Sequence, residues 1–70
     1  MVERWYQKHR MEWIAETLRV FGFINREHIM RKFGLSMPQA SKDLNLFMKI
    51  HPDVGMSYNI KQKRYEAPED

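Results

Sequence analysis

A chain of 70 residues forms one small domain around a single core, with little room for an enzyme cleft beside its scaffold. Twelve Lys and Arg residues against nine Asp and Glu residues give a formal net charge of +3, which fits either a polyanionic partner or an ordinary solvated surface. The absence of cysteine excludes disulfides and thiolate metal sites, and the three separated histidines lack the spacing of metal ligands. We therefore predict no enzyme activity, no metal and no cofactor.

The positive charge is concentrated in the chain before its last four residues. Residues 1–66 contain all twelve basic residues but only seven of the nine acidic ones. No apolar run approaches the roughly 20 residues that a membrane-spanning helix needs, and the N-terminus lacks the apolar segment of a signal peptide. The sequence therefore predicts a cytoplasmic protein with no membrane partner.

The first predicted helix runs from about Glu3 to Val20, within a segment that we place at residues 1–22. Side chains of one helix face recur there at three- and four-residue spacing. They are Trp5, Tyr6, Trp13, Ile14, Thr17, Leu18 and Phe21. Gly22 ends this helix, and the following Phe23-Ile24 predicts a short extended link that adds a stub of strand.

The second predicted helix covers about residues 26–33, within a segment placed at 25–34. Asn25 is a good N-cap, and Ile29, Met30 and Phe33 share one face. Gly34 supplies the left-handed residue that closes a helix, where a Cβ would be penalised.

The third predicted helix covers about residues 37–50, within a segment placed at 36–51. Ser36 is its N-cap, and Pro38 lies in its first turn, where no backbone donor is lost. Its apolar face consists of Ala40, Leu44, Phe47 and Met48. Pro52 stops the helix, because the residue before a proline disfavours the helical region.

After Val54-Gly55 the hydrophobic period changes from helical to alternating. Two short strands joined near residues 59–62 predict a β-hairpin within a segment placed at 54–67. The single domain, residues 1–70, is therefore mainly α with a small β-hairpin. Three helices followed by a hairpin are the order of a winged helix-turn-helix, in which the hairpin is the wing.

The third helix is the predicted recognition helix, because it follows a tight turn and carries a polar face that can enter a major groove. The candidates for reading bases are Met37, Gln39, Ser41, Lys42 and Asn45. Gln and Asn pair with adenine and Lys donates to guanine. The alternatives are that this polar face is only solvated, and that Met37 contacts the protein core instead of a thymine methyl.

A second group is predicted to contact the DNA backbone through helix N-termini and basic side chains. Its members are Asn25, Arg26, Ser36, Lys61, Lys63 and Arg64. Plain helix capping is the alternative for the start of the second helix. Asp43 is a poor neighbour for a phosphate, so we expect it to pair with a basic residue or to cap backbone donors.

Trp5, Tyr6 and His9 lie upstream of the part of the first helix that the core needs. An aromatic overhang is costly to leave in water, so these residues are the candidate interface of a homodimer that reads a palindrome. The alternative is that the tryptophans fold down on the hairpin.

Phe23-Ile24-Asn25-Arg26 and the stretch from Phe33 to Leu44 resemble the N-terminal winged helix of bacterial WYL-domain transcriptional regulators, which are DeoR-like. That family carries a "GRINR" link, an "FGIS-x-x-QAS-x-DL" segment and a "Y-x-x-x-x-K-x-Y" wing, to which Tyr58–Tyr65 is similar. The resemblance covers about residues 13–67 and implies a DNA-binding domain. Family members continue into a ligand-sensing WYL domain, so we expect either an excised domain or a short regulator of the kind that mobile elements and phages encode.

Two functional hypotheses follow. The first is a sequence-specific regulator that binds double-stranded DNA, acting as a repressor that occupies a promoter, with the wing on the backbone or in the minor groove. The alternative is a winged-helix module that binds another protein and no DNA, because a fold does not fix a function. Non-specific RNA binding is a more distant third reading.

Overall fold

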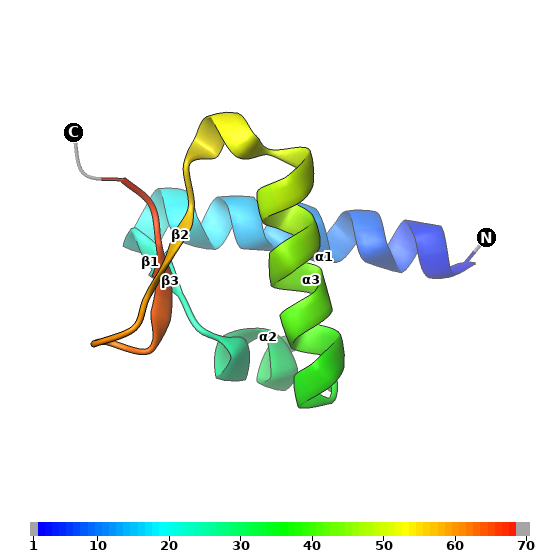
Figure 1. Ribbon diagram of the computed structural model, residues 1–70. Helices are drawn as coiled ribbons and strands as arrows, with labels where there is room; N and C mark the ends of the chain where they lie inside the picture. The colour runs from blue at the N-terminus through cyan, green and yellow to red at the C-terminus, as the bar shows by residue number, and fades with distance from the viewer. Residues whose placement is uncertain (1, 69–70) are drawn as a thin grey trace.

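The computed structural model describes residues 2–68. Three helices and a small sheet make up the fold (Figure 1). The helices are α1 (Val2–Phe21), α2 (Arg26–Phe33) and α3 (Met37–Ile50), and a short 3-10 helix η1 (Pro52–Val54) follows. The strands are β1 (Phe23–Ile24), β2 (Ser57–Asn59) and β3 (Arg64–Glu66). The predicted fold class, three helices and a hairpin wing, is confirmed.

The predicted stub of strand joins the wing. The three strands form one antiparallel sheet in the order β1-β3-β2, with Ile24 opposite Tyr65 and Tyr65 opposite Tyr58. The backbone N–H of Ala67 donates to the carbonyl of Gly22 at 3.0 Å, so the end of the hairpin is attached where α1 ends. The wing is therefore held against α1 by backbone pairing.

Local capping chemistry sets the ends of α2 and the start of α3. Asn25 Oδ1 accepts from the backbone N–H of His28 at 3.0 Å, and His28 Nδ1 accepts from the backbone N–H of Asn25 at 3.3 Å. Gly34 has φ 67°, the left-handed conformation expected for it. Ser36 Oγ accepts from the backbone N–H of Gln39 at 3.4 Å and begins α3.

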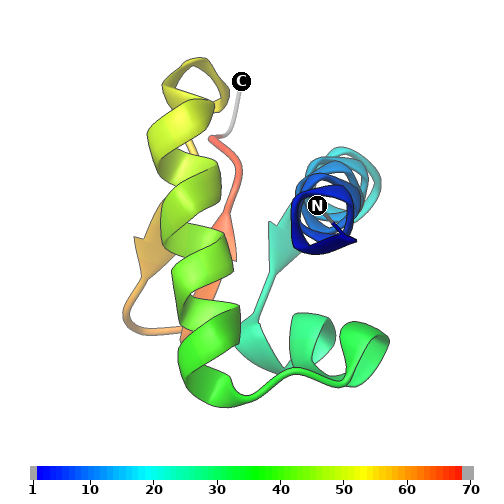
Figure 2. The same cartoon turned by 90° about the vertical axis from the view of Figure 1, so that its right-hand side faces the viewer.

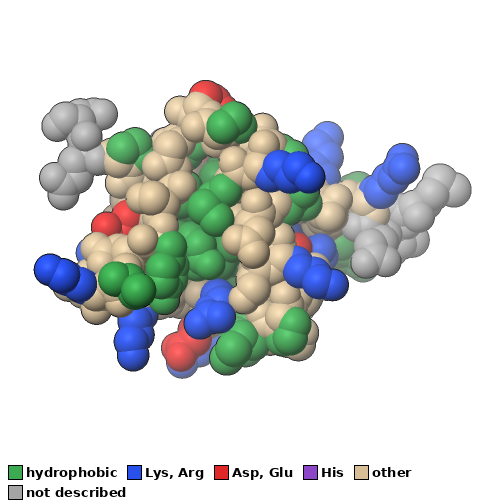
Figure 3. Space-filling model, viewed as in Figure 1, with side chains coloured by type: hydrophobic (Ala, Val, Ile, Leu, Met, Phe, Trp, Pro, Cys, Tyr) green, Lys and Arg blue, Asp and Glu red, His purple; other side chains and the backbone are tan. Residues whose placement is uncertain are grey.

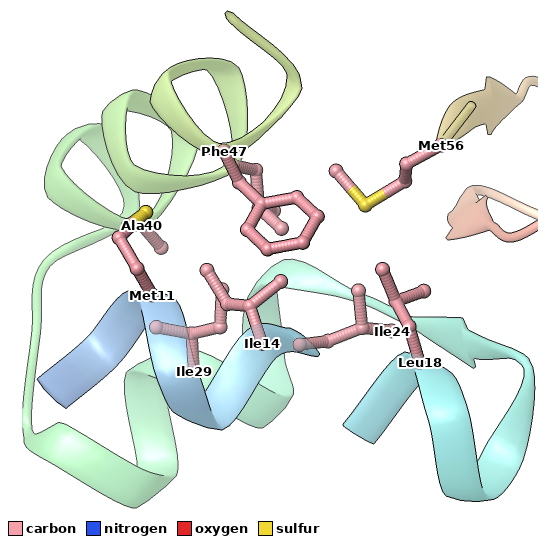
Figure 4. Packing of buried hydrophobic residues seen from close by; sticks show 9 residues of the cluster. Met11, Ile14, Leu18, Ile24, Ile29, Ala40, Phe47 and Met56 are labelled. Carbon is pink, nitrogen blue, oxygen red and sulfur yellow. The ribbon is translucent and has the colours of Figure 1, made fainter. Parts of the chain in front are cut away.

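The core lies where α1, α2, α3 and the sheet meet (Figure 4). In Figure 2, α2 and α3 form the two arms of an L, and α1 is seen end-on at the open side between them. Each of the three helices and strand β1 contributes a buried side chain. The fully buried hydrophobic residues are Ile14, Ile24, Ile29, Ala40, Leu44 and Phe47.

The inward face of α1 is narrower than the helical spacing indicates. Trp13 is half-buried and Ile14, Thr17 and Leu18 are buried, but Phe21 is 68% exposed. Residues 4–9 are all exposed, because α1 extends past the other helices at its N-terminal end (Figure 1). Periodicity identifies one helix face, and the neighbouring elements decide how much of it is covered.

We predict that Asn25→Ala lowers the free energy of unfolding by about 1 kcal/mol, because it removes the N-cap acceptor of α2. Asn25→Asp is the matched control, since its carboxylate still accepts from the His28 N–H. Urea denaturation followed by far-UV circular dichroism measures both. Equal losses in the two variants would contradict a role for the cap acceptor.

Candidate nucleic-acid interface

The first turns of α3, the helix α2 and the tip of the wing lie toward the same end of the molecule (Figure 1). The turn between α2 and α3 is short, and the Leu35 N–H donates to the Met30 carbonyl at 3.1 Å. Side chains from all three elements line one shallow hollow of about 230 Å³. The hollow is lined by Asn25, Arg26, Glu27, Met30, Met37 and Lys63. Four residues proposed from the sequence as DNA contacts are therefore brought together.

The candidate base-reading residues of α3 differ in exposure. Met37, Lys42 and Asn45 are exposed, with Met37 at 52%. Ser41 and Gln39 are half-buried. Ser41 Oγ accepts from Arg26 Nη1 at 3.4 Å, so Ser41 links the start of α2 to α3.

Gln39 belongs to a buried polar network centred on Asp43. The Asp43 carboxylate is almost fully buried and accepts from Arg10 Nε at 2.6 Å and from Arg10 Nη2 at 3.3 Å. Gln39 Nε2 also donates to Asp43 Oδ1, at 3.0 Å. The expected pairing of Asp43 with a basic residue is confirmed.

Sequence reasoning missed Arg10 as the partner. Arg10 is four residues before Ile14, so helical spacing alone places it on the buried face of α1. A charged residue on a buried face requires a partner of opposite charge. Asp43 lies on the apolar side of α3 beside Leu44, so its position in the sequence likewise indicated a buried charge that needs a partner.

The candidate backbone contacts at the helix starts have mixed exposure. Arg26 and Ser36 are exposed, whereas Asn25 is half-buried because its side chain caps α2. Arg26 lines the shallow hollow and also bonds to Ser41. Both residues at the start of α2 are therefore engaged in local structure as well as placed at the candidate surface.

The tip of the wing is built by Asn59. Its Oδ1 accepts from the backbone N–H groups of Lys61 and Gln62, both at 3.0 Å. Lys63 completes the turn with φ 55°, a left-handed conformation unusual for a residue with a Cβ. Lys61 and Lys63 are both exposed, so the turn presents two ammonium groups to solvent.

Arg64 is half-buried and engaged within the protein. Its guanidinium lies 4.3 Å from the centre of the Phe23 ring, and its Nε donates to Glu66 at 2.6 Å. Hydrogen bonds from Asn59 and from Arg64 lower the pKa of the Glu66 carboxyl. The stability they contribute is present above the ordinary pKa of a glutamate and is lost as the pH falls through the lowered value.

The aromatic residues at the start of α1 contact one another through their rings. Trp5 is 61% exposed and lies parallel to the His9 ring at 5.4 Å, with Tyr6 edge-on to Trp5 at 5.1 Å. Trp13 packs edge-on against Phe33 of α2 at 5.6 Å. The hairpin lies beside the C-terminal end of α1, away from its start (Figure 1), and the aromatic ring contacts of Trp5 and Trp13 within residues 2–68 are made to α1 and α2.

Charge on the face seen in Figure 3 is interspersed with apolar surface. Lys and Arg side chains project from the wing, from the end where α2 and α3 meet, and along α3, while hydrophobic side chains fill the band between α3 and the wing.

Within residues 2–68, no group of three His, Asp or Glu side chains is placed to hold a metal ion. No helix of this described part is long and apolar enough to cross a membrane.

Comparison of the sequence with known protein families identifies the family of this chain. Residues 6–70 match the family model described as the BrxR transcriptional regulator winged helix-turn-helix domain. The chain belongs to this family. The match confirms the winged helix-turn-helix and the resemblance to the N-terminal domain of bacterial transcriptional regulators.

Curated relatives carry the same segment within much longer chains. The chain is similar to the DNA-binding transcriptional repressor CapW of Escherichia coli strain KTE188, with 41% identity over 64 residues, covering 91% of this chain and 21% of that protein. It is also similar to CapW of Pseudomonas aeruginosa, with 38% identity over 66 residues, covering 94% of this chain and 22% of the relative. The chain therefore spans about a fifth of the length of these relatives.

We predict that Arg10→Met lowers the free energy of unfolding by about 3–5 kcal/mol, because it leaves the Asp43 carboxylate buried without its cation. The double variant Arg10→Met/Asp43→Leu should recover most of that loss, since it replaces the ion pair with apolar groups of similar size. Urea denaturation of the single and double variants measures the difference.

The exposed pair Glu16–Arg19 is the control for this test. Glu16→Ala removes an ion pair that water already screens, so its effect should be much smaller than that of Arg10→Met. A double variant as unstable as Arg10→Met would show that the site tolerates no apolar replacement, contrary to the prediction.

Proposed function

We propose that this chain is a double-stranded DNA-binding domain of a transcriptional repressor, with the first turns of α3 in the major groove. The observation that carries the proposal is the placement of the first turns of α3, which begin at exposed Met37 and include exposed Lys42, toward the same end as the basic tip of the wing, with exposed Asn45 about one turn further along α3. Membership of a transcriptional-regulator family and similarity to proteins named as DNA-binding repressors support it.

In this arrangement the side chains of α3 contact different chemical groups of the DNA. Asn45 pairs with adenine, Lys42 donates to the acceptors of guanine, and Met37 contacts a thymine methyl. Ser41, held by Arg26, contacts a base or a phosphate beside them. Gln39 lies in the same first turns and is tied to Asp43.

The DNA backbone is contacted at both sides of α3. The backbone N–H groups at the starts of α2 and α3, near Asn25 and Ser36, bind phosphates together with Arg26. Lys61 and Lys63 place the wing on the phosphate backbone or in the minor groove. Arg64 supports the wing from within through Phe23 and Glu66, and contributes to the same positive field.

Repression would follow from occupying a promoter in competition with the polymerase. The compartment we propose is the cytoplasm, and the role is regulatory rather than enzymatic. Where this domain belongs to a longer chain, as the length of its relatives suggests, we propose that a WYL-type sensing domain follows it and supplies the response to an effector.

We also propose a homodimer formed through the aromatic overhang, defined as Trp5, Tyr6 and His9. The stacked rings of the overhang are exposed, and their burial in a second copy would stabilise a twofold pair. Two copies related in this way read the two half-sites of a palindrome.

One observation favours the alternative of a protein-binding module. Ile60 at the tip of the wing is 78% exposed and Tyr58 is 43% exposed, so the wing carries apolar surface beside its lysines. A module of this kind would bind a protein partner through the wing and would show no affinity for duplex DNA at low salt.

For the DNA proposal, we predict that Lys61→Gln/Lys63→Gln weakens binding to every duplex alike and makes the plot of log affinity against log salt shallower by about two. For each lysine removed, binding releases about one counterion fewer from the DNA. Fluorescence anisotropy with a selected duplex at several salt concentrations measures the slope. Lys8→Gln removes one lysine charge from the exposed start of α1 and should leave the slope unchanged.

A wild-type chain that binds no duplex in a random pool at low salt would contradict the DNA proposal. A slope unchanged in the wing variant, with tight binding retained, would place the backbone contacts elsewhere than on the wing.

For the dimer proposal, we predict that Trp5→Ala/Tyr6→Ala raises the dimer dissociation constant by about a thousandfold, because central aromatic anchors contribute about 2 kcal/mol or more each and every 1.4 kcal/mol is about tenfold. Analytical ultracentrifugation across a concentration series measures it. Phe21→Ala is the matched control, since Phe21 is an equally exposed aromatic residue at the other end of α1. A wild type that stays monomeric at high concentration, free and on palindromic DNA, would rule out the overhang interface.

A further inference from the structure

Gln39 lies one helical turn before Asp43 on α3, and the buried network holds its amide. We infer that the Arg10–Asp43 pair orients the Gln39 amide to read an adenine, so that Arg10 and Asp43 are positioning residues for base specificity. This inference rests on the proposed DNA-binding function and adds a specificity device that begins in α1.

The carboxylate fixes which end of the amide faces it. Asp43 carries only acceptors when paired with a guanidinium, so the Nε2 end of Gln39 must face it and Oε1 must face away. Arg10 holds the carboxylate itself through two hydrogen bonds, at 2.6 and 3.3 Å. The side chains of Arg10 and Asp43 are 10% and 1% exposed, so water does not compete for these bonds.

The amide retains the groups that recognise a base. Asp43 uses one of the two Nε2 hydrogens, and no other hydrogen bond to the Gln39 side chain occurs among residues 2–68. With the hydrogen trans to Oε1 donated to Asp43, the remaining N–H and Oε1 form a coplanar donor and acceptor. Adenine offers the complementary N7 acceptor and N6 donor in the major groove.

The same geometry rejects guanine. Guanine presents two acceptors, N7 and O6, so Oε1 would face O6 without a hydrogen between them. A free glutamine can turn its amide over or swing aside to relieve this conflict, whereas the tethered amide cannot. Because the orientation is set during folding, less side-chain freedom is lost when the base is bound.

The test is a comparison of Gln39→Ala in two backgrounds, wild type and Arg10→Met/Asp43→Leu. The position read by Gln39 is found by selecting sequences with wild type and with the Gln39→Ala variant, and affinities are then measured for duplexes carrying each base there. In wild type, Gln39→Ala should reduce the preference for adenine by about five- to 150-fold. In the untethered background it should reduce it by less than about threefold.

Asn45→Ala is the matched control, because Asn45 is on the same helix and makes no hydrogen bond to Asp43 in the described residues. Its effect should be equal in both backgrounds. A merely structural role for the ion pair would change overall affinity or stability, but it would leave the effect of Gln39→Ala on base preference the same in both.

A measurement on the wild type alone covers the case in which the double variant fails to fold. In the free protein one Gln39 Nε2 proton should exchange with solvent much more slowly than the other, and it should stay protected on the selected duplex. Equal and fast exchange of both protons would overturn the tether.

The outcomes separate the two proposals. A wild type that binds no duplex overturns the DNA-binding function and this inference with it. A wild type that binds a selected motif, with a base preference that Gln39→Ala leaves unchanged, overturns only the inference. Equal losses of preference in both backgrounds also overturn it.

Discussion

The buried contact between Arg10 and Asp43 is a polar constraint that ties α3 to α1 at a fixed point. It joins the two longest helices through residues 33 apart in the sequence, beside buried residues that are apolar except for Thr17. Hydrophobic packing alone is tolerant of small rotations, because many similar contacts have similar energies. A carboxylate that meets a guanidinium and an amide at hydrogen-bond distance is less tolerant, so the pair fixes the local contact between Asp43, Arg10 and Gln39. Breaking such a pair is costly, whereas replacing both partners with apolar groups of similar size is often neutral.

Local chemistry explains why the helix-turn-helix could be predicted from the sequence almost residue by residue. Asn25, Gly34 and Ser36 each act through hydrogen bonds or backbone angles within four residues of themselves, and the structure has them in the expected roles. The alternation after Gly55 likewise predicted the hairpin, because strand period is a local signal. The candidate residues at the tip of the wing follow from that turn.

Long-range pairing explains what the sequence left open. The partner of Asp43 lies in another helix, and the position of Arg64 over Phe23 depends on β1 joining the hairpin. The exposure of Trp5 and Phe21 depends on where the other helices end, since both lie at regular spacing with buried residues. Propensity and period contain no information about which distant elements meet. For this reason Gln39, expected on a polar helix face, is instead bound through its amide to a buried carboxylate.

Helix α1 connects these features into one mechanical unit. At its centre Arg10 orients α3, and at its end Gly22 and β1 hold the wing through the Ala67 hydrogen bond and the sheet. The two elements proposed to contact DNA are therefore both attached to α1. The exposed start of α1 carries the aromatic overhang. A partner bound to that overhang would act on α3 and the wing together, because no flexible joint lies between Trp5 and Phe21 within α1. The spacing of the proposed DNA contacts is thus set in part by the length of one helix.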